Sequence, residues 1–427
     1  MISRRRFVQA GALATLGAGS LARSETEASC PPPSPSIAAL ASMKDQAVPI
    51  TKEERAGRQE KARRRMRDQG MHALLLMEGS SLEYFTGIRW WGGERLFVVV
   101  FPVSGDPICI CPAFEEGRAR EQMAKSPVAD RADVRTWKED DNPYELLGRA
   151  LKDHGLSAGA VGMEETIRYV FSSGIAKASP HLQVVSATPV TAGCRMIKSD
   201  HEVALMRLAS KVTLAAYEAT YRALKDGMTR EQVSDLVDAA YDTLGFPGEV
   251  DVSTREYTSF PHGSRAPQII REGTIILLDD GCKVEGYTSD ITRTFVLGKA
   301  TDKMKKVFDI VHRAQSEALK TARPGVECQA VDAAVRKVIV DAGYGPDYKF
   351  FTHRVGHGMG MDGHEWPYLV RGNSLKLAAN MTFSDEPGIY IPGEFGIRLE
   401  DDMRITENGA ELFTPQSPSL EEPFGRA

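Results

Sequence analysis

The chain has 427 residues, of which 42% are hydrophobic and 26% charged, and its formal net charge at pH 7 is −5. This length and composition indicate a globular protein of two or three domains and exclude a disordered chain. The acidic balance argues against a nucleic-acid partner, because domains that bind phosphate backbones usually carry a basic excess on one face.

The first 22 residues, 1–22, are typical of a twin-arginine export signal. Three arginines, residues 4–6, precede Phe7 and an uncharged, weakly apolar run that is too short to span a membrane. Arginines at this place direct a protein to the bacterial route that exports folded proteins. Small residues at Ser20 and Ala22 favour cleavage after Ala22. We therefore expect a periplasmic or secreted protein without a membrane span.

Residues 23–50 are expected to be a proline-rich linker. The stretch Cys30–Ser36 is rich in proline and should form an extended polyproline II spacer. Cys30 is either a plain linker residue or a lipidated one, and the residues before it lack the aliphatic side chain that lipidation sites favour. The other five cysteines show no C-x-x-C spacing, so no disulfide framework is predicted.

Residues 51–193 are predicted to form an α/β domain. Thr51–Glu54 reads as a capping box that begins a charged helix. The apolar runs 72–77 and 96–102 and a shorter run at 109–111 are typical of buried strands. Because helical and strand patterns alternate along this segment, we expect a sheet covered by helices.

Residues 194–427 are predicted to form a second, α+β domain. Capping boxes at Ser199–Glu202 and Thr229–Gln232 each begin a helix. Strand patterns dominate at 274–295 and again at 381–406. We expect two helix pairs flanking antiparallel strands.

Two carboxylates stand in the first of these strand regions. A buried strand ends at Asp279, and the next strand carries Asp290. If the chain turns at the Val284–Glu285 bond, Asp279 faces Asp290 directly across the hairpin. Like charges so placed destabilise a sheet unless a cation lies between them. This register therefore predicts a metal site.

Further candidate ligands follow along the chain. His357 has a glycine on each side, Glu386 precedes a Pro-Gly turn, and Glu400 lies two residues after Arg398. An oxygen-rich site with one imidazole suits Mn, Fe, Co or Zn. The predicted ligands are Asp279, Asp290, His357, Glu386 and Glu400.

These segments resemble the pita-bread metallopeptidases (family M24), which contain methionine aminopeptidases, aminopeptidase P and the Xaa-Pro dipeptidases, or prolidases. Their motifs occupy about residues 262–401 in the order of the family, and Tyr84–Gly87 resembles a string of the proline-specific branch. The resemblance implies an α+β fold with a pita-bread (creatinase/aminopeptidase-like) C-terminal domain. It also implies a smaller α/β creatinase-like N-terminal domain and a homodimer.

The resemblance further implies two divalent metal ions, with Mn expected first and Co, Zn or Fe as alternatives. Asp279 would bind one ion, Asp290 and Glu400 would bridge both, and His357 with Glu386 would complete the other. Glu386 would also carry a proton from water to the leaving amine.

Three more catalytic residues are implied by matching motifs. His262 and His364 would hydrogen-bond the scissile amide and its oxyanion, and Arg398 would bind a substrate carboxylate. His353 is expected to support them. The motif G-x-G-x-x-G at 358–363 follows no apolar strand, so we do not expect dinucleotide binding.

The resulting hypothesis is an exported peptidase that hydrolyses the Xaa-Pro imide bond of dipeptides or short peptides, as a dipeptidase or an aminopeptidase. One alternative is a metal-dependent lyase of a small sulfonium compound on the same fold. That branch is expected to carry an acidic residue where this chain has Gly281. A second alternative is a non-catalytic peptide-binding scaffold, which the intact ligand set disfavours.

Overall fold

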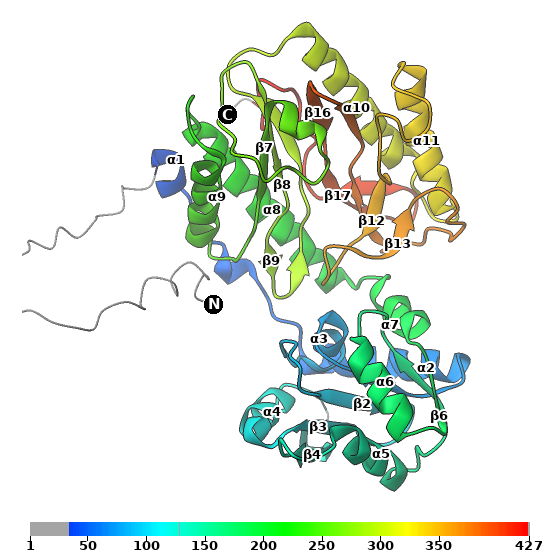
Figure 1. The fold of residues 1–427 in the computed structure, drawn as a ribbon. Coiled ribbons are helices and arrows are strands. Elements are labelled where there is room, and N and C mark those ends of the chain that lie inside the picture. Colours follow the sequence, from blue (N-terminus) through cyan, green and yellow to red (C-terminus); the bar gives the residue numbers. More distant parts are fainter. Residues whose placement is uncertain (1–33, 128, 426–427) are drawn as a thin grey trace, which may run out of the picture. The chain divides into compact units, whose positions relative to one another are not determined.

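The structure, a computed structural model, describes residues 34–127 and 129–425 (Figure 1). The predicted export signal and Cys30 lie outside these residues. Among the described helices, none combines the length and the apolar character needed to cross a membrane.

The described part of the predicted linker is folded, which differs from the sequence prediction. Helix α1, Pro35–Ala38, contacts α8 and α9, and Ile37 is fully buried there. The Ser36 hydroxyl donates to the carbonyl oxygen of Ala219 at 2.7 Å. A proline at the first helical position is already constrained to a helical φ, so residues 35–38 form a short helix where an extended spacer was expected to end.

The N-terminal domain is built around a six-stranded mixed sheet of order β4-β3-β2-β1-β5-β6 (Figure 1). Its strands are β1 Met71–Leu76, β2 Val98–Pro102, β3 Ile108–Pro112, β4 Asp133–Trp137, β5 Gly159–Met163 and β6 Leu182–Ser186. Its helices are α2 Lys52–Asp68, α3 Ser80–Thr86, α4 Glu116–Met123, α5 Pro143–Asp153, α6 Tyr169–Ala178 and α7 Thr188–Arg195. Alternate residues of β1 enter different hydrophobic clusters, so both faces of the sheet are covered.

The C-terminal domain pairs four helices with antiparallel strands (Figure 1). The helices are α8 Asp200–Ala223, α9 Arg230–Leu244, α10 Asp302–Thr321 and α11 Cys328–Asp341. One sheet has the order β11-β8-β7 and another β13-β12-β14-β17-β18, and two hairpins, β9-β10 and β15-β16, accompany them. The strands are β7 Asp251–Thr254, β8 Ile275–Asp279, β9 Lys283–Val284, β10 Tyr287–Thr288, β11 Arg293–Val296, β12 Gly356–Gly358, β13 Glu365–Leu369, β14 Thr382–Asp385, β15 Gly388–Ile391, β16 Phe395–Arg398, β17 Asp401–Ile405 and β18 Ala410–Leu412.

The hairpin that carries the first two predicted ligands has a different register from the predicted one. Its turn residues are Glu285 and Gly286, both with positive φ, at 49° and 89°. Such a two-residue turn matches the twist of the strands. The register places Asp279 opposite Thr292 and not opposite Asp290. Because the shift is two residues, both carboxylates stay on one face.

Arg58 of α2, Glu202 of α8 and Tyr287 of β10 form a buried link between the two domains. The guanidinium of Arg58 donates to the Tyr287 hydroxyl at 2.7 Å, and this hydroxyl donates to Glu202 at 2.8 Å. Glu202 also closes the capping box with Ser199. The first turn of α8 is therefore fixed by its own sequence and by the N-terminal domain.

Candidate active site

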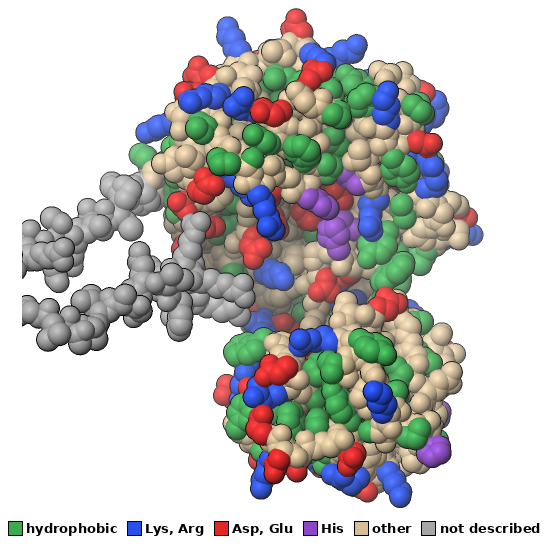
Figure 2. Space-filling model, viewed as in Figure 1, with side chains coloured by type: hydrophobic (Ala, Val, Ile, Leu, Met, Phe, Trp, Pro, Cys, Tyr) green, Lys and Arg blue, Asp and Glu red, His purple; other side chains and the backbone are tan. Residues whose placement is uncertain are grey.

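All the predicted site residues line one cavity of about 390 Å³ in the C-terminal domain. They come from separate segments: Asp279 ends β8, His357 lies in β12, and Glu386 follows β14. Figure 2 shows histidine side chains side by side at a recessed part of the surface. The cavity is lined by Pro261, His262, Asp279, Asp280, Asp290, His353, Arg354, His357, Gly363, His364, Glu386, Arg398 and Glu400.

The ligand atoms fall into overlapping groups in which all atoms lie within 4.8 Å of one another. Asp279, Asp290 and Glu400 form one group. His357, Glu386 and Glu400 form another, so the two groups share Glu400 and together contain every predicted ligand. His364 joins Asp290 and His357 in a further group, although we had not predicted it as a ligand. Two ligand sets that share a carboxylate suit a bridged pair of metal ions.

The protonation state of His357 suits a ligand. Its Nδ1 faces the carbonyl oxygen of Gly358 at 3.1 Å, which assigns the proton to Nδ1. The free Nε2 then points at Asp290 and Glu386, 3.6 and 3.5 Å away. Burial, with a contribution from His364, lowers the pKa of His357 to about 3. The imidazole is therefore neutral and able to bind a metal.

The carboxylates are crowded and buried, and a bound cation would reduce the repulsion between their negative charges. Burial raises the pKa values of Asp290 and Glu400 well above their ordinary range, and neighbouring carboxylates raise them further. Burial also raises the pKa of Glu386 to about 8, although Arg398 opposes this. One oxygen of Glu400, Oε1, is buried without a hydrogen-bond partner among the described residues. Divalent ions would supply the missing positive charge, so these residues fit a dinuclear centre.

Two supporting residues were not identified from the sequence. The Thr292 hydroxyl lies 2.6 Å from both Asp279 and Glu400, and its single proton can serve only one of them at a time. Asp402 accepts from the backbone N–H of Asp290 at 3.2 Å and from the Ser210 hydroxyl of α8 at 2.7 Å. The alternation of the strand places Thr292 on the same face as Asp290, so its position near the ligands could have been predicted. The role of Asp402 could not, because it depends on contact with α8.

Arg398 has partners that the sequence did not predict. It is buried and forms an ion pair with Asp279. It also donates to the Thr292 hydroxyl at 2.9 Å, to the carbonyl oxygen of Pro261 at 2.8 Å and to the Tyr390 hydroxyl at 3.1 Å. Most of its N–H donors therefore bind groups that surround the predicted metal ligands and hold them in place.

His353 continues this chain of contacts. Its Nδ1 donates to the carbonyl oxygen of Arg354 at 2.8 Å, so its Nε2 accepts from the Tyr390 hydroxyl at 2.6 Å. Burial, with Arg398 nearby, lowers the pKa of His353 to about 3. This neutral histidine orients Tyr390, in keeping with a supporting role.

The loop that carries His364 is held by buried ion pairs. Glu365 contacts Lys198 at 2.6 Å and also pairs with Arg195, which contacts Asp362 at 2.6 Å. The His364 ring stacks on His357 with centroids 3.7 Å apart. His262 also lines the cavity, on the segment that follows β7. The Glu365 contacts could not be predicted from the sequence, since their partners are about 170 residues away.

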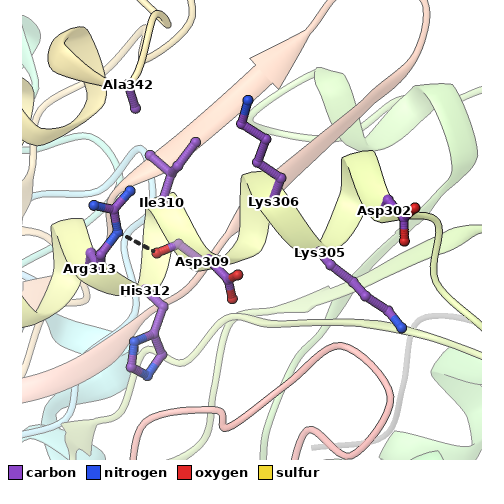
Figure 3. A pocket seen from close by; sticks show the side chains of 8 residues that line it. All are labelled: Asp302, Lys305, Lys306, Asp309, Ile310, His312, Arg313 and Ala342. Atoms are coloured by element: carbon purple, nitrogen blue, oxygen red, sulfur yellow. Dashed lines mark hydrogen bonds between the residues drawn. The ribbon is translucent and has the colours of Figure 1, made fainter.

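A larger hollow, of about 770 Å³, lies along α10 (Figure 3). Figure 3 shows acidic and basic side chains, among them Asp309 and Arg313, on the turns of one helix. It contains none of the predicted site residues. This open hollow lacks the converging buried groups of the smaller cavity.

Comparisons with known proteins identify the family and the fold of this chain. A model of metallopeptidase family M24 matches residues 204–407, and a model of the creatinase/prolidase N-terminal domain matches residues 58–197. The solved structure of dipeptidase PepE from Mycobacterium ulcerans has a TM-score of 0.81 and 33% identity, covering 88% of this chain and 99% of that chain.

Two curated relatives point the same way. A Mycobacterium tuberculosis protein named "Probable dipeptidase PepE" is 34% identical over 349 residues, which are 80% of this chain and 90% of its own. The Xaa-Pro dipeptidase of Lactobacillus delbrueckii subsp. lactis is 29% identical over 377 residues, which are 83% of this chain and 96% of its own.

This chain therefore belongs to metallopeptidase family M24, whose members depend on a dinuclear metal centre. The predicted fold, a creatinase-like domain followed by a pita-bread domain, is confirmed. The chain is a metallopeptidase, and its relatives support the hydrolysis of dipeptides.

Proposed function

We propose that this chain is an exported Xaa-Pro dipeptidase that cleaves the imide bond before proline. The observation that carries the proposal is the pair of ligand groups that share Glu400 within one cavity. The similarity to an Xaa-Pro dipeptidase supports the substrate class. Two bound divalent ions, with Mn expected first and Co, Zn or Fe as alternatives, would polarise the scissile carbonyl and lower the pKa of water.

The side chains of the cavity would then do the rest of the chemistry. Glu386 would accept a proton from the attacking water and deliver it to the leaving imino nitrogen. His364 and His262 line the cavity and can each donate an N–H to the carbonyl oxygen as charge develops there.

The test measures free proline released from Xaa-Pro dipeptides, and the free first residue together with Pro-Xaa released from an Xaa-Pro-Xaa tripeptide, with protein loaded in turn with Mn, Co and Zn. Cleavage of dipeptides alone would establish the dipeptidase, and cleavage of the tripeptide an aminopeptidase. If no peptide is cleaved with any metal, the proposal fails.

The sulfonium lyase is disfavoured by the backbone at Gly281. A Cβ at this position would lie 2.0 Å from the carbonyl oxygen of Ser289. No side chain fits so close to a backbone atom, so the acidic residue expected in the lyase branch could not stand here. Assay of a sulfonium substrate alongside the peptides would separate the two reactions.

We also propose export and a homodimer. Replacing the three arginines at residues 4–6 by lysine keeps the charge but should stop export, measured as the periplasmic fraction of the protein.

In the N-terminal domain, Trp91 and Phe114 are 65% and 67% exposed, and a second subunit could cover them. Sedimentation equilibrium of the mature protein tests the dimer, and a monomer at micromolar concentration would contradict it.

A further inference from the structure

Two arginines, Arg354 and Arg398, line the candidate active-site cavity, and their guanidinium groups differ in what they contact. Arg398 is buried and binds Asp279, Thr292, Tyr390 and a backbone carbonyl oxygen. Its donors are therefore largely occupied. A substrate carboxylate could bind it only by displacing a contact that orients Asp279, one of the predicted metal ligands.

The guanidinium of Arg354, by contrast, forms no hydrogen bond or ion pair with any described residue. It lies 4.3 Å above the centre of the Tyr368 ring. Its backbone is fixed as well, because its carbonyl oxygen accepts from His353 at 2.8 Å. A half-buried arginine that is stacked on an aromatic ring keeps its fork of N–H donors free in the plane of the guanidinium.

Arg354 is also close to the reacting groups. Its positive charge adds to burial in lowering the pKa values of His357 and His364, and it opposes the rise that burial causes in the pKa of Glu386. In a dipeptide the free carboxylate lies only about one residue length, roughly 3.5 Å, from the scissile bond. Its receptor must therefore line the same cavity as the metal ligands, and Arg354 does.

We propose that Arg354 binds the C-terminal carboxylate of the dipeptide and thereby limits the substrate to two residues. Arginine and carboxylate form a charge-assisted, bidentate pair. A longer peptide has an amide at this point and would leave the guanidinium without a charged partner. Its cleavage should therefore be disfavoured relative to that of the dipeptide. The inference rests on the proposed dipeptidase function and assigns the carboxylate contact to Arg354 in place of Arg398.

The experiment compares an Xaa-Pro dipeptide with its C-terminal amide, using the wild type and Arg354→Gln. For the wild type we expect the acid to be preferred. Arg354→Gln should raise KM for the acid about tenfold or more, as expected for loss of a hydrogen bond to a charged group, and should lower kcat/KM for the acid much more than for the amide, so that the preference for the acid is lost. Arg354→Lys should restore part of the preference.

A matched control is Arg371→Gln. Arg371 also lies over a tyrosine ring, that of Tyr348, but it is exposed and does not line the cavity. It should keep the wild-type preference for the acid. The metal content of each variant should equal that of the wild type.

A binding measurement separates failure of this inference from failure of the proposed function. Isothermal titration calorimetry with a non-hydrolysable reduced-bond dipeptide and its amide measures the contact without turnover. If the wild type cleaves no dipeptide, the proposed function fails, and the calorimetric acid preference still tests Arg354. If Arg354→Gln weakens acid and amide equally, or changes neither, the inference is overturned.

Discussion

At the scale of single residues, Glu386 and Asp290 have different expected roles although both lie in the candidate centre. Glu386→Gln keeps the size of the side chain but cannot carry a proton, so kcat should fall by roughly 10²–10⁴-fold with part of the metal retained. Asp290→Ala removes a ligand that lies near both groups and should lower the metal content itself. Metal analysis together with the proline-release assay measures both effects.

The control for these variants is Glu394→Gln. Glu394 is an exposed partner of Lys303 outside the cavity, and its replacement should leave metal content and activity unchanged. An Asp290→Ala protein with both metals and full activity would contradict the ligand assignment.

The crowded carboxylates also predict how stability depends on pH. The pKa of Glu386 is about 8 in the folded chain against an ordinary value of 4.5, so the folded state binds the proton more tightly than the unfolded state. Glu386 therefore makes the stability of the metal-free protein fall as the pH rises from about 4.5 to about 8, whereas His353 and His357, whose pKa values are lowered to about 3, act in the opposite direction up to about pH 6.5. Melting temperatures between pH 6.5 and pH 8 therefore measure the contribution of the buried acids.

Two comparisons sharpen the pH experiment. Glu386→Gln should have a shallower slope because one of the contributing groups no longer titrates. Loading with Mn should reverse the slope, since ligands must lose their protons to bind the ion. A metal-free wild type whose melting temperature rises over this interval would contradict the burial of these acids.

At the scale of elements, the helix starts could be predicted from the sequence and the hairpin register could not. The capping boxes at Thr51, Ser199 and Thr229 are all present, because each needs only residues three apart in the chain. The hairpin was misplaced by two residues because Glu285 adopts a positive φ. A glutamate rarely does so, and no local pattern marks it.

Gly286 is the residue on which this hairpin depends most. Its φ of 89° is unfavourable for a β-branched side chain, so Gly286→Val should destabilise the protein by about 1–3 kcal/mol. It should also weaken metal binding, since the hairpin positions Asp279 and Asp290. Denaturant unfolding and metal titration measure the two effects.

Gly105→Val is a suitable comparison for the hairpin variant. Gly105 has a similar φ of 94° in the N-terminal domain, and a Cβ added there would have no atom within 4 Å outside its immediate chain neighbours. This variant should lose stability but retain normal metal affinity. Equal losses of metal affinity in both variants would mean that the hairpin has no special role.

At the scale of the whole molecule, the buried ion pairs of Glu365 connect α7 and the start of the C-terminal domain to the loop of His364. Glu365→Gln would leave the Lys198 ammonium without its partner, which should cost about 3 kcal/mol of stability. Loosening the loop should also lower kcat, because His364 would be less well placed, while the metal content stays normal.

The exposed pair Arg207–Glu411 provides the contrast. Glu411→Gln should change the free energy of unfolding by less than about 1 kcal/mol, because solvent screens this pair. If Glu365→Gln is equally mild and fully active, the loop does not depend on its ion pairs.

The limits of the sequence prediction are also clearest at this scale. The candidate metal ligands could be predicted because each stands in a short motif, and the structure brings them together in one cavity. The contacts of Asp402 with α8 and of Glu365 with Lys198 join segments more than 160 residues apart, and no motif in one segment names its partner in the other. The free guanidinium of Arg354 could be distinguished from that of Arg398 only once their neighbours were known.

The link between Arg58, Glu202 and Tyr287 bears on how the two domains can be recombined. A chimera that joins this catalytic domain to the N-terminal domain of a relative without an arginine at the position of Arg58 would bury the Glu202 carboxylate without its cation. In a library that recombines segments of this chain with those of relatives, folded proteins should mainly be of two kinds. Either Arg58 comes from the same parent as the catalytic domain, or a neutral residue replaces Glu202. The crossover point that best preserves folding would then lie ahead of α2, and not in the stretch between α7 and α8.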